Sequence, residues 1–356
     1  MTRRRNSGQT RNSGRASDSG RLIIDSAAKL RASLKRLGLS DPAVNAAWPR
    51  WWSSEADFSA SAQAELRFGI ARRLGLDPAS LLQDEPRFVW REEARFKGLR
   101  AEDDDRVQAG IASFGRAVAA AAIAATPPTQ NSLEGVAAEV VRAQVLSDSP
   151  VVSLYELLVL SWAIGVPVVH LRIFPWTTKR MAAMTVRVGD RDSVLLAREA
   201  AYPAWPAFYL AHELGHIALG HVVADHTLVD LEADLDSQGS DEEEAAADRW
   251  ALELLTGFPD PQVLSATGNA SAAELARVSI ESAHELHIEP GTLALCFGHT
   301  TRNWRVANGA LKLIYTAPSP VWRAINSVAR QQLDLGSLAP DAADFLEDVL
   351  DLQRDG

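Results

Sequence analysis

The spacing of apolar residues predicts that most of the chain is helical. Near the N-terminus, apolar residues three or four positions apart form two helical faces, each followed by a glycine: Leu30, Leu34 and Leu37 before Gly38, and Leu66, Ile70 and Leu74 before Gly75. A glycine directly after the last periodic residue is a common helix end. Asp77-Pro78 then begins a shorter helix, and the acidic residues 103–105 suit the first turn of a helix that continues to Ala125. Residues 21–128 are therefore expected to form a helical N-terminal region.

The pattern changes after the Thr-Pro-Pro-Thr stretch of residues 126–129, which interrupts the helical periodicity. Five elements are expected after this boundary, in this order: a helix over 133–146, a helix over 152–164, a β-type run over 166–173, and two strands, 184–188 and 193–196, joined as a hairpin by residues 189–192. Pro206 can occupy the first turn of the next helix. The sequence therefore predicts an α+β fold, mostly helical, with a small β-sheet packed on the helix that begins near Pro206.

The chain is expected to divide into four parts. Residues 1–20 are rich in Arg, Ser, Gly and Asn and should form a disordered tail. Residues 21–128 form the helical region, 129–260 the domain that contains the sheet, and 261–356 a C-terminal helical region. The apolar stripes that predict this last region include Leu275, Val278 and Leu286, and later Phe345, Val349 and Leu350.

Residues 212–216 carry the motif His-Glu-x-x-His within an apolar stretch, Phe208–Leu219. On a helix, positions i and i+4 share a face, so His212 and His216 can direct a ring nitrogen at the same ion. Glu213 would lie beside that ion without binding it, where it can take a proton from metal-bound water as a general base. The alternative is a core helix with two hydrogen-bonded histidines, but the apolar flanks and the motif together favour a zinc site.

A catalytic zinc site needs three protein ligands and one open position for water. The extended metzincin motif, His-Glu-x-x-His-x-x-Gly-x-x-His, would need Gly at 219 and His at 222, where this chain has Leu219 and Val222. That class is therefore disfavoured. A gluzincin-like site needs a carboxylate on a second helix instead.

Residues 241–255, DEEEAAADRWALELL, can supply that carboxylate. Glu244 lies on the apolar side of this predicted helix, and Asp248, one turn further on, can accept the outer N–H of a ligand histidine and fix its tautomer. Glu243 is less favoured because Ala247, four residues later, cannot do this. We therefore expect one Zn²⁺ per chain, with Glu244 as the third ligand.

Other histidines are weaker candidates. His221 and His226 can approach the metal, but His221 lies one position beyond the face that the motif histidines share. His284 and His287 are three residues apart and are expected on a surface helix. His170 is expected to be a packed residue or to lie at a sheet edge.

The composition is that of an ordinary globular protein, with 356 residues of which 47% are hydrophobic and 23% charged. The single cysteine, Cys296, excludes an intrachain disulfide, is expected to be buried, and fits a reducing cytoplasm. No apolar h-region follows the N-terminal arginines, and the longest bland apolar run, Ala117–Ala125, is too short to span a bilayer. We therefore expect a cytoplasmic protein without a membrane segment.

The site residues resemble those of the ImmA/IrrE family of metallopeptidases. The two matching stretches are Phe208-x-x-Ala211-His212-Glu213-x-Gly215-His216-x-x-Leu219-Gly220-His221 and Glu244-x-x-Ala247-Asp248-x-Trp250-Ala251-x-x-Leu254-Leu255. With the strand and hairpin before them, they span residues 133–258. The resemblance implies zinc ligands at His212, His216 and Glu244, and a general base at Glu213.

Some positions depart from the family pattern. Residues 204–207 are Ala-Trp-Pro-Ala where members often have Arg or Gln before the Phe, and the linker 225–243 is long and acidic. Asp248 stands where Asn is usual, and Trp250 where Phe is usual. These departures affect the expected substrate preference more than the expected chemistry.

In this family the peptidase often follows a repressor-type helix-turn-helix domain, and known members cleave repressors of that type. Residues 66–82 resemble the last helices of such a domain, whereas the tryptophan-rich segment around residues 48–52 matches poorly. A degenerate helix-turn-helix module and an unrelated helical cap both remain open. The sequence around residues 48–61 offers few side chains suited to base edges, and the net charge is −10, so we expect DNA binding by this region to be weak.

We therefore expect a zinc-dependent metallo-endopeptidase whose substrate is a regulatory, repressor-type protein. One alternative is a DNA-binding transcriptional regulator whose zinc domain is sensory or structural. Its phosphate contacts would come from Arg67, Arg72 and Arg73 and from the arginine-rich tail. A third reading is a metal hydrolase that acts on something other than protein. An intact Glu213 favours an enzyme, because a structural zinc site needs no base.

Overall fold

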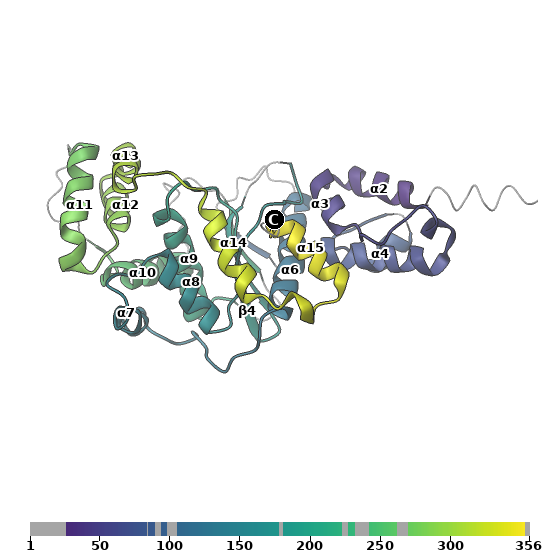
Figure 1. The fold of residues 1–356 in the computed structure, drawn as a ribbon, viewed down its shortest axis with the longest axis horizontal. Helices are drawn as coiled ribbons and strands as arrows, with labels where there is room; N and C mark the ends of the chain where they lie inside the picture. Colours follow the sequence, from purple (N-terminus) through teal and green to yellow (C-terminus); the bar gives the residue numbers. More distant parts are fainter. Residues whose placement is uncertain are drawn as a thin grey trace, which may run out of the picture.

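The computed structural model describes residues 26–83, 85–89, 94–97, 105–177, 181–222, 227–231, 242–261 and 270–352 (Figure 1). The predicted tail of residues 1–20 and the weak candidate His226 lie outside these residues. The helices are α2 (Ser26–Leu37), α3 (Asp41–Ala47), η1 (Ala56–Phe58), α4 (Ala60–Leu74), α5 (Pro78–Leu82), α6 (Asp105–Ala124), α7 (Ala138–Leu146), α8 (Leu154–Ala163), α9 (Ala204–Ala218), α10 (Glu242–Thr256), α11 (Ala272–Leu286), α12 (Pro290–Thr301), α13 (Trp304–Ile314), α14 (Val321–Gln332), η2 (Leu335–Ser337) and α15 (Pro340–Leu350). The strands are β1 (Ala94–Lys97), β2 (Val168–His170), β3 (Met181–Val188), β4 (Arg191–Leu196) and β5 (Thr227–Leu231). The expected α+β class, mostly helical with a small sheet, is confirmed.

Local sequence signals account for several helix ends. Gly75 caps α4 in the left-handed conformation, with φ at 65°, as the glycine after the last periodic residue predicts. Asp77 caps α5 by accepting a hydrogen bond from the amide of Ala79, with Pro78 in the first turn. Ser153 begins α8 with a capping box, in which its side chain and that of Glu156 satisfy each other's backbone amides.

The five strands form one mixed sheet in the order β1-β5-β3-β4-β2. β3 pairs antiparallel with both β4 and β5, whereas the outer strands β1 and β2 pair parallel with β5 and β4. The hairpin of β3 and β4 is confirmed, but its turn is shorter than predicted. Val188 pairs with Arg191, so only Gly189 and Asp190 lie between the strands. Strands β1 and β5 were not predicted.

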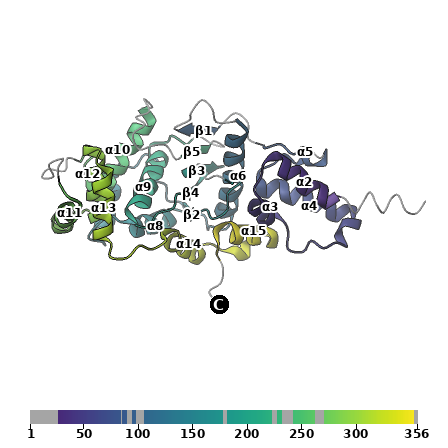
Figure 2. The same cartoon turned by 90° about the horizontal axis from the view of Figure 1, so that it is seen from above.

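The sheet lies between two layers of helices (Figure 2). One face, with Met184, Val186 and Leu195, packs in a core shared with α6, the N-terminal helices and α15. The other face, with Ala183 and Val194, packs in a second core shared with α8, α9, α10 and α14. A third, smaller core joins α11, α12 and α13 next to the start of α9. Helix α9 therefore lies against β3 and β4 of the sheet and also contacts α8, α10 and α12.

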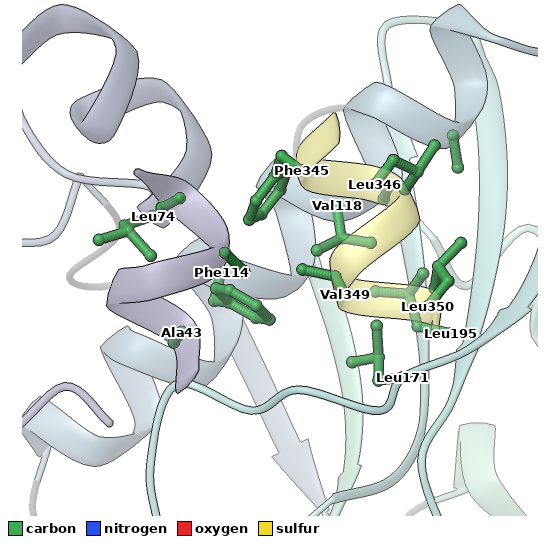
Figure 3. Close-up of a cluster of buried hydrophobic side chains, with 14 of the residues drawn as sticks. Ala43, Leu74, Phe114, Val118, Leu171, Leu195, Phe345, Leu346, Val349 and Leu350 are labelled. Carbon is green, nitrogen blue, oxygen red and sulfur yellow. The ribbon is translucent and has the colours of Figure 1, made fainter. Parts of the chain in front are cut away.

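The last helix of the chain joins the N-terminal helices to the sheet (Figure 3). The apolar side of α15 carries Phe345, Leu346, Val349 and Leu350, all at most 1% exposed. Figure 3 shows these side chains together with Leu74 of α4, Phe114 and Val118 of α6, and Leu171 and Leu195 from the sheet side. The acidic side of α15 faces cations of the N-terminal region: Arg73 binds Asp341 at 3.0 Å, and Arg50 binds Asp344 at 2.7 Å. One core thus crosses the boundary expected near residue 128.

Within the described residues, α6 is the one helix long and apolar enough to cross a membrane, judged by length and composition. Its apolar surface packs inside the protein against β3 and β4 on one side and α4 and α15 on the other. Gly115 shows how close this packing is, because a Cβ at that position would lie 2.3 Å from Sδ of Met184. Burial within the core accounts for the composition of α6 without a membrane.

Candidate metal centre

Helix α9 places the His-Glu-x-x-His motif in the interior. Its residues from Tyr209 to Ala218 are all buried, because the helix packs on β3 and β4, α8 and α10. His212, Glu213 and His216 expose 3%, 1% and 1% of their surface. The apolar flanks of the motif predicted a buried helix, and the helix is buried. Its three ionisable side chains are therefore shielded from solvent.

A glycine between the motif histidines lets α10 approach α9. A Cβ on Gly215 would lie 3.1 Å from the carbonyl oxygen of Ala247 and 3.4 Å from the ring of Trp250. The contact with Ala247 is tighter than most Cβ contacts, so a side chain at this position requires the α10 backbone to give by a few tenths of an ångström. The close approach brings Glu244, in the first turn of α10, against both histidines.

Arg142 of α7 fixes the other end of α10. Its guanidinium donates hydrogen bonds to the carbonyls of Leu254 and Leu255 at the end of α10, and to those of Leu286 and His287 at the end of α11. The C-terminus of a helix carries partial negative charge, so a cation is favourable there. The burial of this side chain lowers the pKa of Arg142. One cation thus joins the ends of two helices and sets the position of the helix that carries Glu244.

Three predicted ligands converge. Nε2 of His212 lies 3.0 Å from Nε2 of His216 and 3.3 Å from Oε2 of Glu244. Nε2 of His216 lies 3.6 Å from Oε1 of Glu244. In the described part of the chain, these three residues form the group of His, Cys, Asp or Glu side chains that can hold a metal ion, and all three are buried.

The donor atoms fit a tetrahedral metal ion such as zinc. Ligands 2.0–2.2 Å from a tetrahedral ion lie about 3.3–3.6 Å from each other, close to the separations found here. Asp248 accepts from Nδ1 of His212, so the neutral form of this ring carries its lone pair on Nε2, facing the lone pairs of Glu244. Burial, the largest effect, lowers the pKa of His216 and keeps that ring neutral near pH 7. Electron pairs that face one another in a buried site repel unless a cation lies between them, so the residues fit a metal.

Each ligand histidine has an outer partner. Oδ1 of Asp248 lies 2.8 Å from Nδ1 of His212, as the spacing on α10 predicted. Nδ1 of His221 lies 2.9 Å from Nδ1 of His216. These contacts turn the Nε2 atoms of both rings toward Glu244. His221, a weak ligand candidate in the sequence, therefore lies outside the ligand group as a partner of a ligand.

Glu213 is held by a residue that the sequence did not single out. The hydroxyl of Thr185, on β3, donates a hydrogen bond of 2.5 Å to Oε2 of Glu213. Both side chains are buried. An ionised carboxylate offers only acceptors, so a hydroxyl that donates to it stabilises the charged form in the interior.

Aromatic and cationic side chains surround the N-terminal half of α9. The ring of Phe208, one turn before His212, lies 6.3 Å from the His212 ring between centroids. Trp205 lies 6.0 Å from Tyr209 by the same measure. Arg198, just before α9, donates a 2.5 Å hydrogen bond to the hydroxyl of Tyr209. The N-terminal half of α9 therefore carries aromatic side chains beside the guanidinium of Arg198.

The remaining candidates lie away from the centre. Glu243 is half-buried and is not one of the converging residues, whereas Glu244 is buried. His287 caps α11, and Nδ1 of its ring lies 3.0 Å from the Pro150 carbonyl oxygen. His170 is buried at the edge strand β2, and Cys296 is buried in α12, where burial raises the pKa of its thiol to about 12. A thiol in that state is protonated at neutral pH and is not a nucleophile.

Comparisons of the chain with known protein families, curated proteins and solved structures found no match.

Proposed function

We propose that the protein is a zinc-dependent metallo-endopeptidase with a gluzincin-like centre. The observation that carries the proposal is the buried convergence of His212, His216 and Glu244, with Glu213 next to the first ligand on the same helix. Two imidazoles and one carboxylate would hold zinc with three protein ligands, the number typical of catalytic rather than structural zinc sites. Zinc, when bound, supplies a Lewis acid that lowers the pKa of water and polarises the carbonyl of the scissile bond.

The chain's own residues supply the proton transfers and the positioning. Glu213 takes the proton of the attacking water as the O–C bond to the peptide carbonyl forms, and later passes it to the leaving amine nitrogen as the C–N bond breaks. Asp248 holds the His212 ring through Nδ1, and Glu244 completes the ligand set from α10. The resemblance to the ImmA/IrrE peptidases supports a repressor-type protein as substrate. The single buried thiol, Cys296, supports a reducing, cytoplasmic location.

The alternative of a DNA-binding regulator loses one of its expected phosphate contacts. Arg73 is 7% exposed and donates hydrogen bonds to the carbonyl of Ala47 and to Asp341. Arg67 donates to the carbonyl of Leu81. The helix after the α4–α5 turn has five residues, which is short for a helix that reads a major groove. These observations support weak DNA binding, and no feature of the described residues favours the regulator.

The test is substrate trapping with a Glu213→Gln variant of the full chain. The variant keeps the ligands, so we expect it to bind zinc and retain proteins that the wild-type chain cleaves. A Glu243→Gln variant, altered at the neighbouring acid of α10, serves as the control and should cleave normally. Proteins enriched on the Glu213 variant are then incubated with zinc-loaded wild type, with and without a chelator. Cleavage by the Glu213→Gln variant at the wild-type rate would contradict the proposal, as would full activity in chelator.

A further inference from the structure

Thr185 is a buried polar residue next to two apolar neighbours on one face of the sheet. On β3 it follows Ala183 on the face toward α9, and its neighbour in register on β4 is Val194. Both neighbours belong to the core between the sheet and α9, and Thr185 is fully buried among them. A valine has nearly the same shape and would suit this core and strand at least as well. The hydroxyl is what distinguishes threonine here, and its hydrogen-bond partner is Glu213.

The contact fixes one oxygen of the proposed base. Three rotatable torsions set the orientation of the Glu213 carboxylate relative to α9, so the backbone alone does not fix it. The hydroxyl of Thr185 donates to Oε2 from the central strand, which is held on both sides by β4 and β5. Proton transfer in a transition state is sensitive to such orientation, because donor and acceptor must meet within hydrogen-bond distance.

We propose that Thr185 is a positioning residue for Glu213. By holding Oε2, it turns the carboxylate so that Oε1 receives the proton of the attacking water. This inference rests on the proposed function, since it assigns Glu213 the role of base. It adds a residue of the sheet to a site whose other members lie on α9 and α10, and it makes the rigidity of β3 part of the catalytic geometry.

The experiment uses the zinc-loaded full chain and acetohydroxamic acid as the probe. This acid binds zinc as its anion, and its hydroxyl proton passes to a neighbouring base: the O–H bond of the probe breaks and an O–H bond on Glu213 forms. Its affinity therefore reports a correctly placed carboxylate without any peptide substrate. The dissociation constants of the probe and of zinc are measured for wild type, Glu213→Gln and three variants of Thr185, to Val, Ser and Ala.

We expect Thr185→Val and Thr185→Ala to weaken probe binding roughly 10- to 100-fold, because the carboxylate is no longer held where it receives the probe's proton, and misplacing a reacting group by about 1 Å can cost about 100-fold. Thr185→Ser keeps the hydroxyl and should stay within about threefold of wild type, while zinc affinity is unchanged in all three. Ser and Ala both lack the γ-methyl group of threonine, and they differ from each other only in the hydroxyl. Their difference therefore isolates the hydroxyl even if the valine variant does not fold.

Three results would overturn the inference. If the Val and Ala variants bind the probe like wild type while Glu213→Gln binds it weakly, Thr185 does not position the base, and the proposed function stands. If these variants lose zinc instead, Thr185 supports the metal ligands rather than the base. If Glu213→Gln itself binds the probe like wild type, Glu213 does not accept the proton, and the proposed function fails together with the inference.

Discussion

Replacing Asp248 tests how much an outer carboxylate contributes to metal binding. In the structure its Oδ1 accepts from Nδ1 of His212 at 2.8 Å, and this contact fixes the tautomer in which Nε2 is free to bind metal. Asp248→Ala leaves the ring able to rotate and to carry its proton on Nε2. Loss of such partners typically weakens metal binding by roughly 10–100-fold, which corresponds to about 1.4–2.8 kcal/mol.

The exposure of the pair narrows this range. The His212 side chain is 3% exposed but that of Asp248 is 44% exposed, so water screens the carboxylate and partly replaces it when it is removed. We therefore expect Asp248→Ala to weaken zinc binding by about tenfold, near the lower end of that range. Asp248→Asn keeps an acceptor oxygen without the charge and should fall between alanine and wild type. Because the pair is partly exposed, the difference between Asp and Asn should shrink as salt is raised.

The assay is competition for zinc with a chromophoric chelator at neutral pH. Glu244→Ala should lose the metal, and Glu243→Ala should bind it like wild type. These two variants therefore give the lowest and highest zinc affinities expected in the assay. Thermal unfolding of each metal-free variant separates weaker binding from a damaged fold. An Asp248→Ala affinity within twofold of wild type would refute the reasoning, because the ring would then be held by its packing alone.

Three further substitutions test packing, hydrogen bonding and burial outside the candidate metal ligands. Gly215→Val places a side chain against Ala247 and should lower zinc affinity at least fivefold, because overpacking costs roughly 1–3 kcal/mol. Unchanged zinc affinity in the same competition assay would contradict the close packing of α9 and α10. Arg142→Met removes hydrogen bonds to four helix-end carbonyls and should lower the free energy of unfolding, measured with urea, by roughly 3–5 kcal/mol. A loss below about 1 kcal/mol would show that these carbonyls find other hydrogen-bond partners. Burial lowers the pKa of His170 below its ordinary value, so below about pH 6.5 the unfolded chain takes up a proton that the folded chain does not. The free energy of unfolding should therefore fall as pH drops from 7.5 to 5.5. In zinc-saturated samples, His170→Asn should reduce the slope of unfolding free energy against pH by up to about 1.4 kcal/mol per pH unit. An identical slope in the variant and the wild type would contradict the assignment of this pH dependence to His170.

Local spacing predicted the part of the site that lies on helices. His212 and His216 share a face because they are four residues apart, and the same rule selected Glu244 with Asp248. Each pair lies within one helix, so its geometry is contained in a few residues of sequence. The meeting of the two helices was inferred from the chemistry that zinc requires and from the family resemblance, not from the spacing within either helix.

Contacts between distant segments had no such signal. Thr185 reaches Glu213 across 28 residues, and in the sequence it is an ordinary β-branched residue of a strand. The short strand β1, Ala-Arg-Phe-Lys, shows no extended apolar alternation, and its partner β5 lies in the stretch read as a linker. Arg73 was grouped with phosphate-binding cations because charge alone does not reveal burial; only the position of α15 shows that it is paired.

The long separation in sequence between α15 and the N-terminal helices has a consequence for synthesis. Arg73 and Asp341 are 268 residues apart, so at 5–20 residues per second a ribosome needs on the order of 13–54 s between them. During that interval the apolar surface of α4 and α6 that Phe345 and Leu346 will cover has no native partner. We expect these helices to be the stretch of the nascent chain that chaperones hold longest. A stop codon between the end of α10 at Thr256 and the start of α15 at Pro340 would leave α9 and α10 intact in sequence but the N-terminal core unfinished.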